Sequence, residues 1–336
     1  KDKDLMPLIE EYSTFIDCRA RDLFEQKTIS SSYENEPFIS RLACIHREKA
    51  QHSLYDELTV RKMRGRAFFD LLHCRALLDI VESIVGPEIT ASPIQHVRPK
   101  LPQGLTPRDG DPHVVPWHQD AAVASEQSDP YPILTVWIPL TEAHQRNGGL
   151  MILPGGHKNG LLRHHFRRGL SIVPSELPKG HERSSKPLQM DRGDILLMTK
   201  HTPHRSTKNT TNGVRWSVDL RFQQTGTKSG RPFFPSFVVR SAADASSVAN
   251  CFLGWQKQWA EAVEAEQKHK YQWYRSTWQK YVGESVCSAR SSTSAFKGKL
   301  QAADTSPEGN SSPALDGAPR EKVARPSYLE GAKFIN

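Results

Sequence analysis

Apolar residues recur at helical spacing through the first third of the chain. They fall three or four positions apart over residues 5–24, and the same spacing returns over residues 37–55. A third stretch covers residues 65–84 and is stopped by Gly86-Pro87. We therefore predict that residues 1–87 form a helical scaffold, which belongs to the same domain as the residues that follow.

The pattern changes after residue 87, where short runs of β-branched and aromatic residues are separated by Pro and Gly. The runs cover residues 89–97, 133–140, 150–153, 195–199 and 214–222. Many short strands with turn residues between them are typical of a β-sandwich or barrel, which we predict over residues 88–240. Inside this core, residues 159–191 form a long basic connection. We expect it to cover a binding site, with a plain solvated loop as the alternative.

The end of the chain divides into two parts of different composition. Residues 249–281 carry aromatic side chains at helical spacing, which predicts a C-terminal helix within residues 241–284 that packs on the core. Residues 285–336 are rich in Ser, Ala, Pro, Gly and charge, and this composition predicts a disordered tail.

Composition is that of a globular protein. Of the 336 residues, 37% are hydrophobic, and no apolar run is long enough to cross a membrane. The chain begins without an apolar signal core, ends without a peroxisomal signal and has five scattered cysteines, so we expect a cytoplasmic protein. The net charge of +8 favours an anionic small molecule as ligand. Without a dense basic stripe, neither nucleic acid nor membrane is an expected partner, and the oligomeric state stays open.

The triplet His118-Gln119-Asp120 holds the first candidate metal ligands. In an extended segment residues two apart point to the same side, so His118 and Asp120 can bind one cation while Gln119 faces elsewhere. Such triplets also occur as ordinary surface residues. A third ligand is available downstream, at His201 or His204. Two imidazoles and one carboxylate leave three positions open on Fe(II), enough for a 2-oxo acid and dioxygen.

A candidate for binding an acidic cosubstrate lies on the strand predicted over residues 214–222. Arg215 and Ser217 share one face of this strand. The guanidinium can therefore pair with a carboxylate at two points while the hydroxyl adds a hydrogen bond. An exposed arginine with a surface partner is the alternative.

Several short motifs, taken in order, resemble the phytanoyl-CoA dioxygenase family of Fe(II)- and 2-oxoglutarate-dependent oxygenases. They are His118-Gln119-Asp120, Thr135-Val136-Trp137-Ile138-Pro139-Leu140, Asn147-Gly148-Gly149-Leu150, Leu153-Pro154-Gly155-Gly156-His157, Gly193-Asp194-Ile195, His204-Arg205-Ser206 and Arg215. The resemblance covers about residues 89–222. The set is specific, although no motif is specific alone.

The resemblance implies a mainly β fold with flanking α-helices and a double-stranded β-helix core, a jelly roll of cupin-like type. It implies that His118, Asp120 and His204 bind Fe(II); His204 is chosen over His201 because its spacing to the residues that follow matches the family. Arg215 would hold the distal carboxylate of 2-oxoglutarate. The residues expected around this cosubstrate are Ser206, Trp137, Gln119, Ser217 and, more loosely, Lys100.

The activity implied is that of a dioxygenase that uses Fe(II), 2-oxoglutarate and O2 to hydroxylate, or otherwise oxidise, a C–H bond of a small organic substrate, releasing succinate and CO2. Asp120 argues against halogenation, because related halogenases carry a small residue at this position. His157 follows Pro-Gly-Gly where the family has Pro-Gly-Ser, and we expect it to serve the loop. The alternatives are a non-catalytic jelly-roll binding or regulatory protein and a metal-dependent non-oxygenase with the same three ligands.

Overall fold

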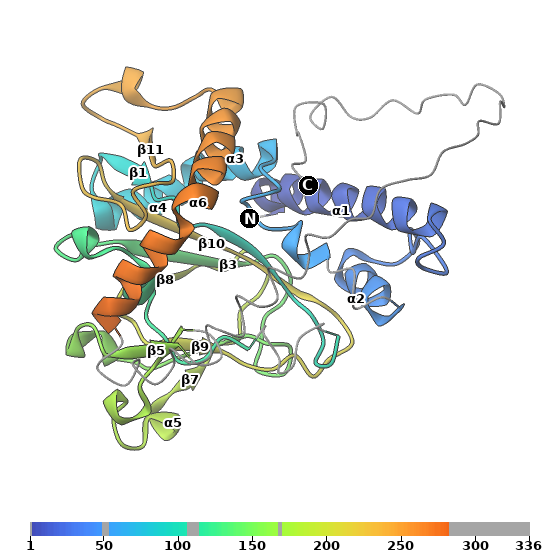
Figure 1. The fold of residues 1–336 in the computed structure, drawn as a ribbon, viewed down its shortest axis with the longest axis horizontal. Helices are drawn as coiled ribbons and strands as arrows, with labels where there is room; N and C mark the ends of the chain where they lie inside the picture. Colours follow the sequence, from blue (N-terminus) through green and yellow to red (C-terminus); the bar gives the residue numbers. More distant parts are fainter. Residues whose placement is uncertain (1, 49–53, 106–113, 167–169, 282–336) are drawn as a thin grey trace, which may run out of the picture. The chain divides into compact units, whose positions relative to one another are not determined.

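The computed structural model describes residues 2–48, 54–105, 114–166 and 170–281, and the N-terminal part is helical as predicted (Figure 1). The described helices of this part are α1 (Asp2–Glu25), α2 (Phe38–Glu48), α3 (Arg66–Leu72) and α4 (Arg75–Val85), with a 3-10 turn at Leu54–Asp56. Their buried side chains belong to the same apolar core as one face of the main sheet.

The single helix predicted over residues 65–84 is wrong, because the chain breaks between α3 and α4 at His73 and Cys74. The buried residues of α3 include Phe68 and Leu72, and those of α4 include Leu78 and Val81. In one continuous helix, at about 100° per residue, these two sets would face roughly opposite sides. The break lets both sets turn toward the same core.

Two antiparallel sheets make up most of the β structure in the described residues. The larger has the order β11 (Phe237–Arg240), β1 (Ile89–Ala91), β10 (Arg215–Gln224), β3 (Leu134–Pro139) and β8 (Leu196–Thr199), and β2 (His96–Lys100) also pairs with β10. The smaller has the order β7 (Lys186–Pro187), β4 (Leu150–Ile152) and β9 (His204–Ser206). A separate hairpin joins β5 (His164–Phe166) to β6 (Leu170–Ile172). This mainly β core with flanking helices confirms the predicted fold class.

The larger sheet has one apolar and one polar face, and β10 shows both. Trp216, Val218 and Leu220 are fully buried in the core shared with the helices. Figure 1 shows α1, α3 and α4 on this side of β10 and β3, with β7 and β9 on the other side. Residues two apart alternate between the faces of a strand, so the polar residues at positions 215, 217, 219, 221 and 223 face the smaller sheet. They too are buried, and they form the interior of the jelly roll.

The remaining predictions have mixed outcomes. The strand predicted over residues 89–97 is two strands, β1 and β2, and the connection at residues 159–191 contains β5, β6, β7 and the short helix α5 (His181–Ser184). The C-terminal helix is α6 (Phe252–Tyr281). The tail predicted at residues 285–336 lies outside the described residues, and the proposed division at residues 87, 240 and 284 stays a prediction. No helix of the described ranges is both long and apolar enough to span a membrane.

Candidate metal centre and its cavity

Three candidate ligands come together beside β9, an edge strand of the smaller sheet. The backbone of His118 exchanges two hydrogen bonds of 3.0 Å with that of His204 at the start of β9, which sets the two imidazoles side by side. Asp120 begins a 3-10 turn, Asp120–Val123, directly after this bridge. One nitrogen of each imidazole and one oxygen of Asp120 lie within 4.8 Å of one another, and His118 Nε2 is 3.9 Å from Asp120 Oδ1. One atom from each of the three side chains thus lies in the same small region, so the group could hold a metal ion.

Each histidine has its ring orientation set by its own backbone. His118 Nδ1 is 2.9 Å from the carbonyl oxygen of Pro116, and His204 Nδ1 is 3.0 Å from that of Thr202. A carbonyl only accepts, so both Nδ1 atoms carry the proton, and both Nε2 atoms keep a lone pair for a metal. Burial, with His204 alongside, lowers the pKa of His118 to about 3. The ligand is therefore neutral at pH 7.

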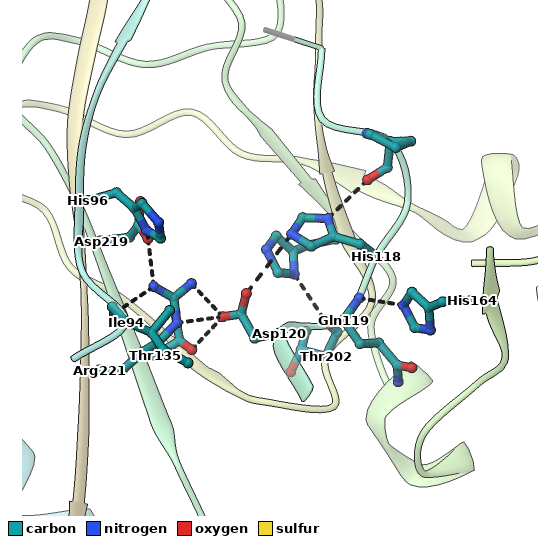
Figure 2. Close-up of polar contacts among 12 residues, drawn as sticks. Ile94, His96, His118, Gln119, Asp120, Thr135, His164, Thr202, Asp219 and Arg221 are labelled. Atoms are coloured by element: carbon teal, nitrogen blue, oxygen red, sulfur yellow. Dashed lines mark hydrogen bonds and ion pairs between the residues drawn. The ribbon is translucent and has the colours of Figure 1, made fainter. Parts of the chain in front are cut away.

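Asp120 has one oxygen free for a metal and one that is fully engaged. Its Oδ2 accepts from Thr135 Oγ1 at 2.6 Å, and from Nε and Nη2 of Arg221 at 3.2 and 2.9 Å (Figure 2). Burial by itself would raise the pKa of Asp120. The charge of Arg221, the two histidines and the Thr135 hydrogen bond together lower it well below its usual range. Asp120 is thus an anion that offers Oδ1 on the side of the histidines.

Arg221 belongs to a buried ionic network that the sequence analysis missed. Its Nη1 donates to Asp219 Oδ2 at 2.6 Å and to the carbonyl oxygen of Ile94 at 3.0 Å (Figure 2). Asp219 also accepts from His96 Nδ1 at 2.8 Å and from Arg98 Nε at 2.7 Å. Continuing the alternation of β10 beyond position 217 would have found residues 219 and 221 on the same face.

Arg215 is a buried cation on the same inner face of β10. Its Nη1 donates to Ser217 Oγ at 2.5 Å, its Nη2 donates to the Gly148 carbonyl oxygen at 2.9 Å, and it lies over the ring of Trp137 at 5.5 Å. Its Nε is buried without a hydrogen-bond partner, and Arg215 forms no ion pair with any described residue. Burial, followed by repulsion from Arg98, lowers the pKa of Arg215 to about 10. An unpaired buried guanidinium of this kind fits a carboxylate ligand.

These groups open onto one cavity of about 270 Å³ between the two sheets. The predicted site residues among its lining are His118, Asp120, His204, Arg215, Ser206, Trp137 and Lys100. Lys100 is buried, and its Nζ donates to Ser206 Oγ at 3.2 Å. The metal ligands and the candidate carboxylate site therefore share one cavity.

Two predicted cosubstrate residues do not line this cavity. Gln119 is fully buried, and its side-chain amide bonds the backbone of residues 160, 162 and 201, so it joins two loops behind the metal ligands. Ser217 is also fully buried and contacts Arg215 from the side. In this structure the amide of Gln119 is engaged by loop backbone and the Ser217 hydroxyl accepts from Arg215, and their roles toward a cosubstrate stay predictions.

The two rejected histidines lie apart from the metal ligands. His201 is not in the group of three, and its carbonyl oxygen accepts from Gln119. His157 is exposed in the turn Gly156–Asn159. The choice of His204 over His201 therefore agrees with the geometry, while its role as a ligand stays a prediction.

The connection at residues 159–191 covers the outer side of the ligand-bearing segments. Glu182 of α5 accepts from Trp117 Nε1 at 3.1 Å and from Arg205 Nη2 at 3.0 Å. Trp117 precedes His118 and Arg205 follows His204, so one carboxylate ties both segments from outside. Part of the predicted basic stretch, residues 167–169, lies outside the described residues.

Comparisons with known proteins point to one family. The sequence model of the family described as phytanoyl-CoA dioxygenase (PhyH) matches residues 20–217. Phytanoyl-CoA dioxygenase 1 of Oryza sativa subsp. japonica is 30% identical over 113 residues, which are 33% of this chain and 39% of that protein. Phytanoyl-CoA dioxygenase of Arabidopsis thaliana is 31% identical over 110 residues, 32% of this chain and 37% of that protein. The matches thus span less than two-fifths of these relatives.

The fold also resembles that of solved structures. The apo form of the non-heme monooxygenase ThoJ superposes with a TM-score of 0.50 at 20% sequence identity, covering 62% of this chain and 77% of that one. At this identity the likeness concerns the fold, and it agrees with a jelly-roll core.

Proposed function

Because this chain belongs to the phytanoyl-CoA dioxygenase family, whose model covers more than half of it, we propose that it is an Fe(II)- and 2-oxoglutarate-dependent dioxygenase. It hydroxylates, or otherwise oxidises, a C–H bond of a small organic substrate and releases succinate and CO2. The observation that carries this proposal is the juxtaposition, in one cavity, of the group His118, Asp120 and His204 with Arg215, a buried guanidinium that forms no ion pair with any described residue.

The three ligands fit Fe(II). Two neutral imidazoles and one monodentate carboxylate, presented from one side, form the donor set of non-heme iron oxygenases and leave positions open for other ligands. Thr135 and Arg221 occupy Asp120 Oδ2, so Oδ1 is the oxygen available to the metal. When bound, iron supplies the centre at which dioxygen is activated at the expense of 2-oxoglutarate.

The opposite part of the cavity fits 2-oxoglutarate. Arg215 would bind its distal carboxylate, with Ser206 and Lys100 as neighbouring polar groups and Trp137 as an apolar wall. Ser217 and the Gly148 carbonyl hold the guanidinium in place before any ligand arrives. Such preorganisation lowers the entropy that binding must overcome. Leu150 and Met198 also line the cavity and help to exclude water.

The two alternatives find less support. A zinc hydrolase would not need the buried arginine, and a protein that only binds an acid would not need the 2-His-1-carboxylate group beside it. Asp120 supports hydroxylation or a related C–H oxidation over halogenation, because its carboxylate occupies the position that a halide would need. The net charge of +8 and the basic residues of the cavity favour an anionic substrate.

The first test is anaerobic titration of the Fe(II)-loaded protein with 2-oxoglutarate, followed by its visible metal-to-ligand charge-transfer band. We expect the band in the wild type, and we expect it to be lost in Asp120→Ala because iron then lacks its anionic ligand. Iron binding without any band would overturn the proposal.

The same titration tests the role of Arg215. Replacing a buried arginine that pairs with a carboxylate costs about 2–4 kcal/mol, so Arg215→Gln should raise the Kd for 2-oxoglutarate roughly 30- to 1000-fold. Arg192→Gln, which removes an exposed arginine paired with Asp2, is the matched control and should leave the Kd unchanged. Equal affinities of the two variants for 2-oxoglutarate would show that Arg215 does not bind this cosubstrate.

A further inference from the structure

The strand β2 presents two polar side chains to the cavity that neither the metal nor the proposed 2-oxoglutarate site uses. His96, Arg98 and Lys100 alternate along its inner face, opposite residues 219, 217 and 215 of β10. Lys100 contacts Ser206 at the end that Arg215 occupies. His96 and Arg98 lie further along the strand, and both line the cavity.

Asp219 orients both of these side chains. It accepts from His96 Nδ1 through Oδ2 and from Arg98 Nε through Oδ1. The acid is itself buried, and its contact with Arg221 fixes it in turn. One anion thus sets the directions of a neutral imidazole and a guanidinium on the same cavity wall.

His96 is a hydrogen-bond acceptor at its free end. Because the carboxylate of Asp219 is an anion that only accepts, His96 Nδ1 carries the proton and Nε2 keeps the lone pair. Burial, with Arg98 nearby, lowers the pKa of His96 to about 4, so the ring is neutral at pH 7. Its side chain is 31% exposed, and Nε2 has no hydrogen bond within the described residues.

Arg98 is a donor with unused capacity. Only Nε is engaged with Asp219, and the two terminal nitrogens make no hydrogen bond to the described residues. Its side chain is 37% exposed. A guanidinium with two parallel N–H groups available matches a carboxylate or a similar oxyanion.

The cavity that this pair lines also has an apolar part. The lining includes Ile94, Val114, Val115, Val123 and Leu170. An apolar body can therefore pack beside the polar wall, which is the usual build of a small-molecule site: a few placed polar groups on an apolar lining.

We propose that His96 and Arg98 form the recognition site for the prime substrate, an organic acid that carries a hydroxyl or amine near its carboxylate and has an apolar body. Arg98 binds the carboxylate, and His96 Nε2 accepts from the neighbouring O–H or N–H. A neutral ester cannot form the charge-assisted pair with the two terminal nitrogens of Arg98, so the site discriminates against it. This inference rests on the proposed oxygenase function, because it concerns the substrate of the same centre.

The test uses a panel of short- and medium-chain compounds in matched triplets: the 3-hydroxy acid, the unsubstituted acid and the methyl ester of the 3-hydroxy acid. Each is added to protein loaded with Fe(II) and 2-oxoglutarate, and succinate formation is measured against concentration. We expect stimulation in the order hydroxy acid, acid, ester. In Arg98→Gln the KM of the acids should rise roughly 10- to 100-fold while that of the ester changes little.

Two further variants separate recognition from folding. Arg98→Lys keeps a cation and should retain the preference for acids over esters, whereas His96→Phe should erase only the advantage of the hydroxy acid. The anaerobic 2-oxoglutarate band of each variant checks that the centre is assembled. The proposed site would be overturned if esters acted as well as acids in the wild type, or if no acid stimulated succinate formation. It would also be overturned if Arg98→Gln reduced the activity with acids and with esters equally. If the wild type shows no charge-transfer band at all, the proposed oxygenase function fails together with the proposed substrate site.

Discussion

The chemistry of the candidate centre depends on the partners of single atoms. Each imidazole is kept in one tautomer by a carbonyl oxygen two residues before it. Asp120 is kept ionised and monodentate by the groups on its Oδ2. Such outer partners commonly change metal affinity about 10- to 100-fold when they are removed. Arg221 therefore has a role that can be measured apart from catalysis.

We predict that Arg221→Lys weakens metal binding about 10- to 100-fold, because a lysine keeps the charge but lacks the planar fork that donates twice to Asp120 and once to Asp219. Calorimetric titration with Co(II), a stand-in for Fe(II), measures this directly. Arg240→Lys is the matched control, since Arg240 pairs with Glu82 on the surface. A variant that unfolds more easily but binds Co(II) like the wild type would limit Arg221 to a structural role.

At the scale of elements, the turn between β3 and β4 brings the cosubstrate site together. Gly148 has a φ of +88°, a region that disfavours residues with a Cβ. Its carbonyl oxygen accepts from Arg215, and a Cβ built on it would lie 2.5 Å from Cγ of the buried Lys100. The backbone at this point thus sets the distance between the two cations.

Gly148→Ala should destabilise the protein and weaken 2-oxoglutarate binding, because Lys100 and Arg215 must both shift. Gly226→Ala is the matched control: its φ is +85°, but nothing lies within 4 Å of its Cβ position. The difference in free energy of unfolding between the two variants isolates the contact with Lys100 and should be about 1–3 kcal/mol. Chemical unfolding and the 2-oxoglutarate titration measure both effects, and identical behaviour of the variants would contradict this role of the turn.

At the scale of the whole molecule, buried histidines link stability to pH. Burial lowers the pKa of His46 on α2 to about 4, and that of His164 beside Gln119 also to about 4. The unfolded chain binds these protons at the ordinary pKa of 6.5, before the folded chain does. The contribution of each neutral histidine to the free energy of unfolding is therefore fully present above pH 6.5, and it is lost as the pH falls from 6.5 toward 4.

We predict that metal-free protein loses about 2 kcal/mol of unfolding free energy per such histidine between pH 7.5 and pH 5. His46→Leu should lose about that much less over the same range, whereas His157→Gln, at an exposed histidine, should behave as the wild type. Urea unfolding at the two pH values measures the difference. The same pH dependence in all three proteins would show that His46 does not contribute.

Much of this protein follows from local patterns. Helical and alternating periodicities predict the N-terminal helices, α6 and most strands of the larger sheet, because side-chain direction repeats within an element. The alternation of β10 places Arg215 beside Ser217, and the order of the motifs indicates the family. A two-residue spacing also suffices to put His118 and Asp120 on one side.

Only the tertiary structure decided what these side chains meet. The pairing of His118 with His204 depends on a backbone bridge between segments 86 positions apart. The diversion of Gln119 into loop contacts and the binding of Asp120 by Arg221 depend on similarly distant partners. The chain breaks between α3 and α4 because the buried residues of both helices must face the same core. Periodicity records direction along one element, whereas the register and packing between elements are set by the fold as a whole.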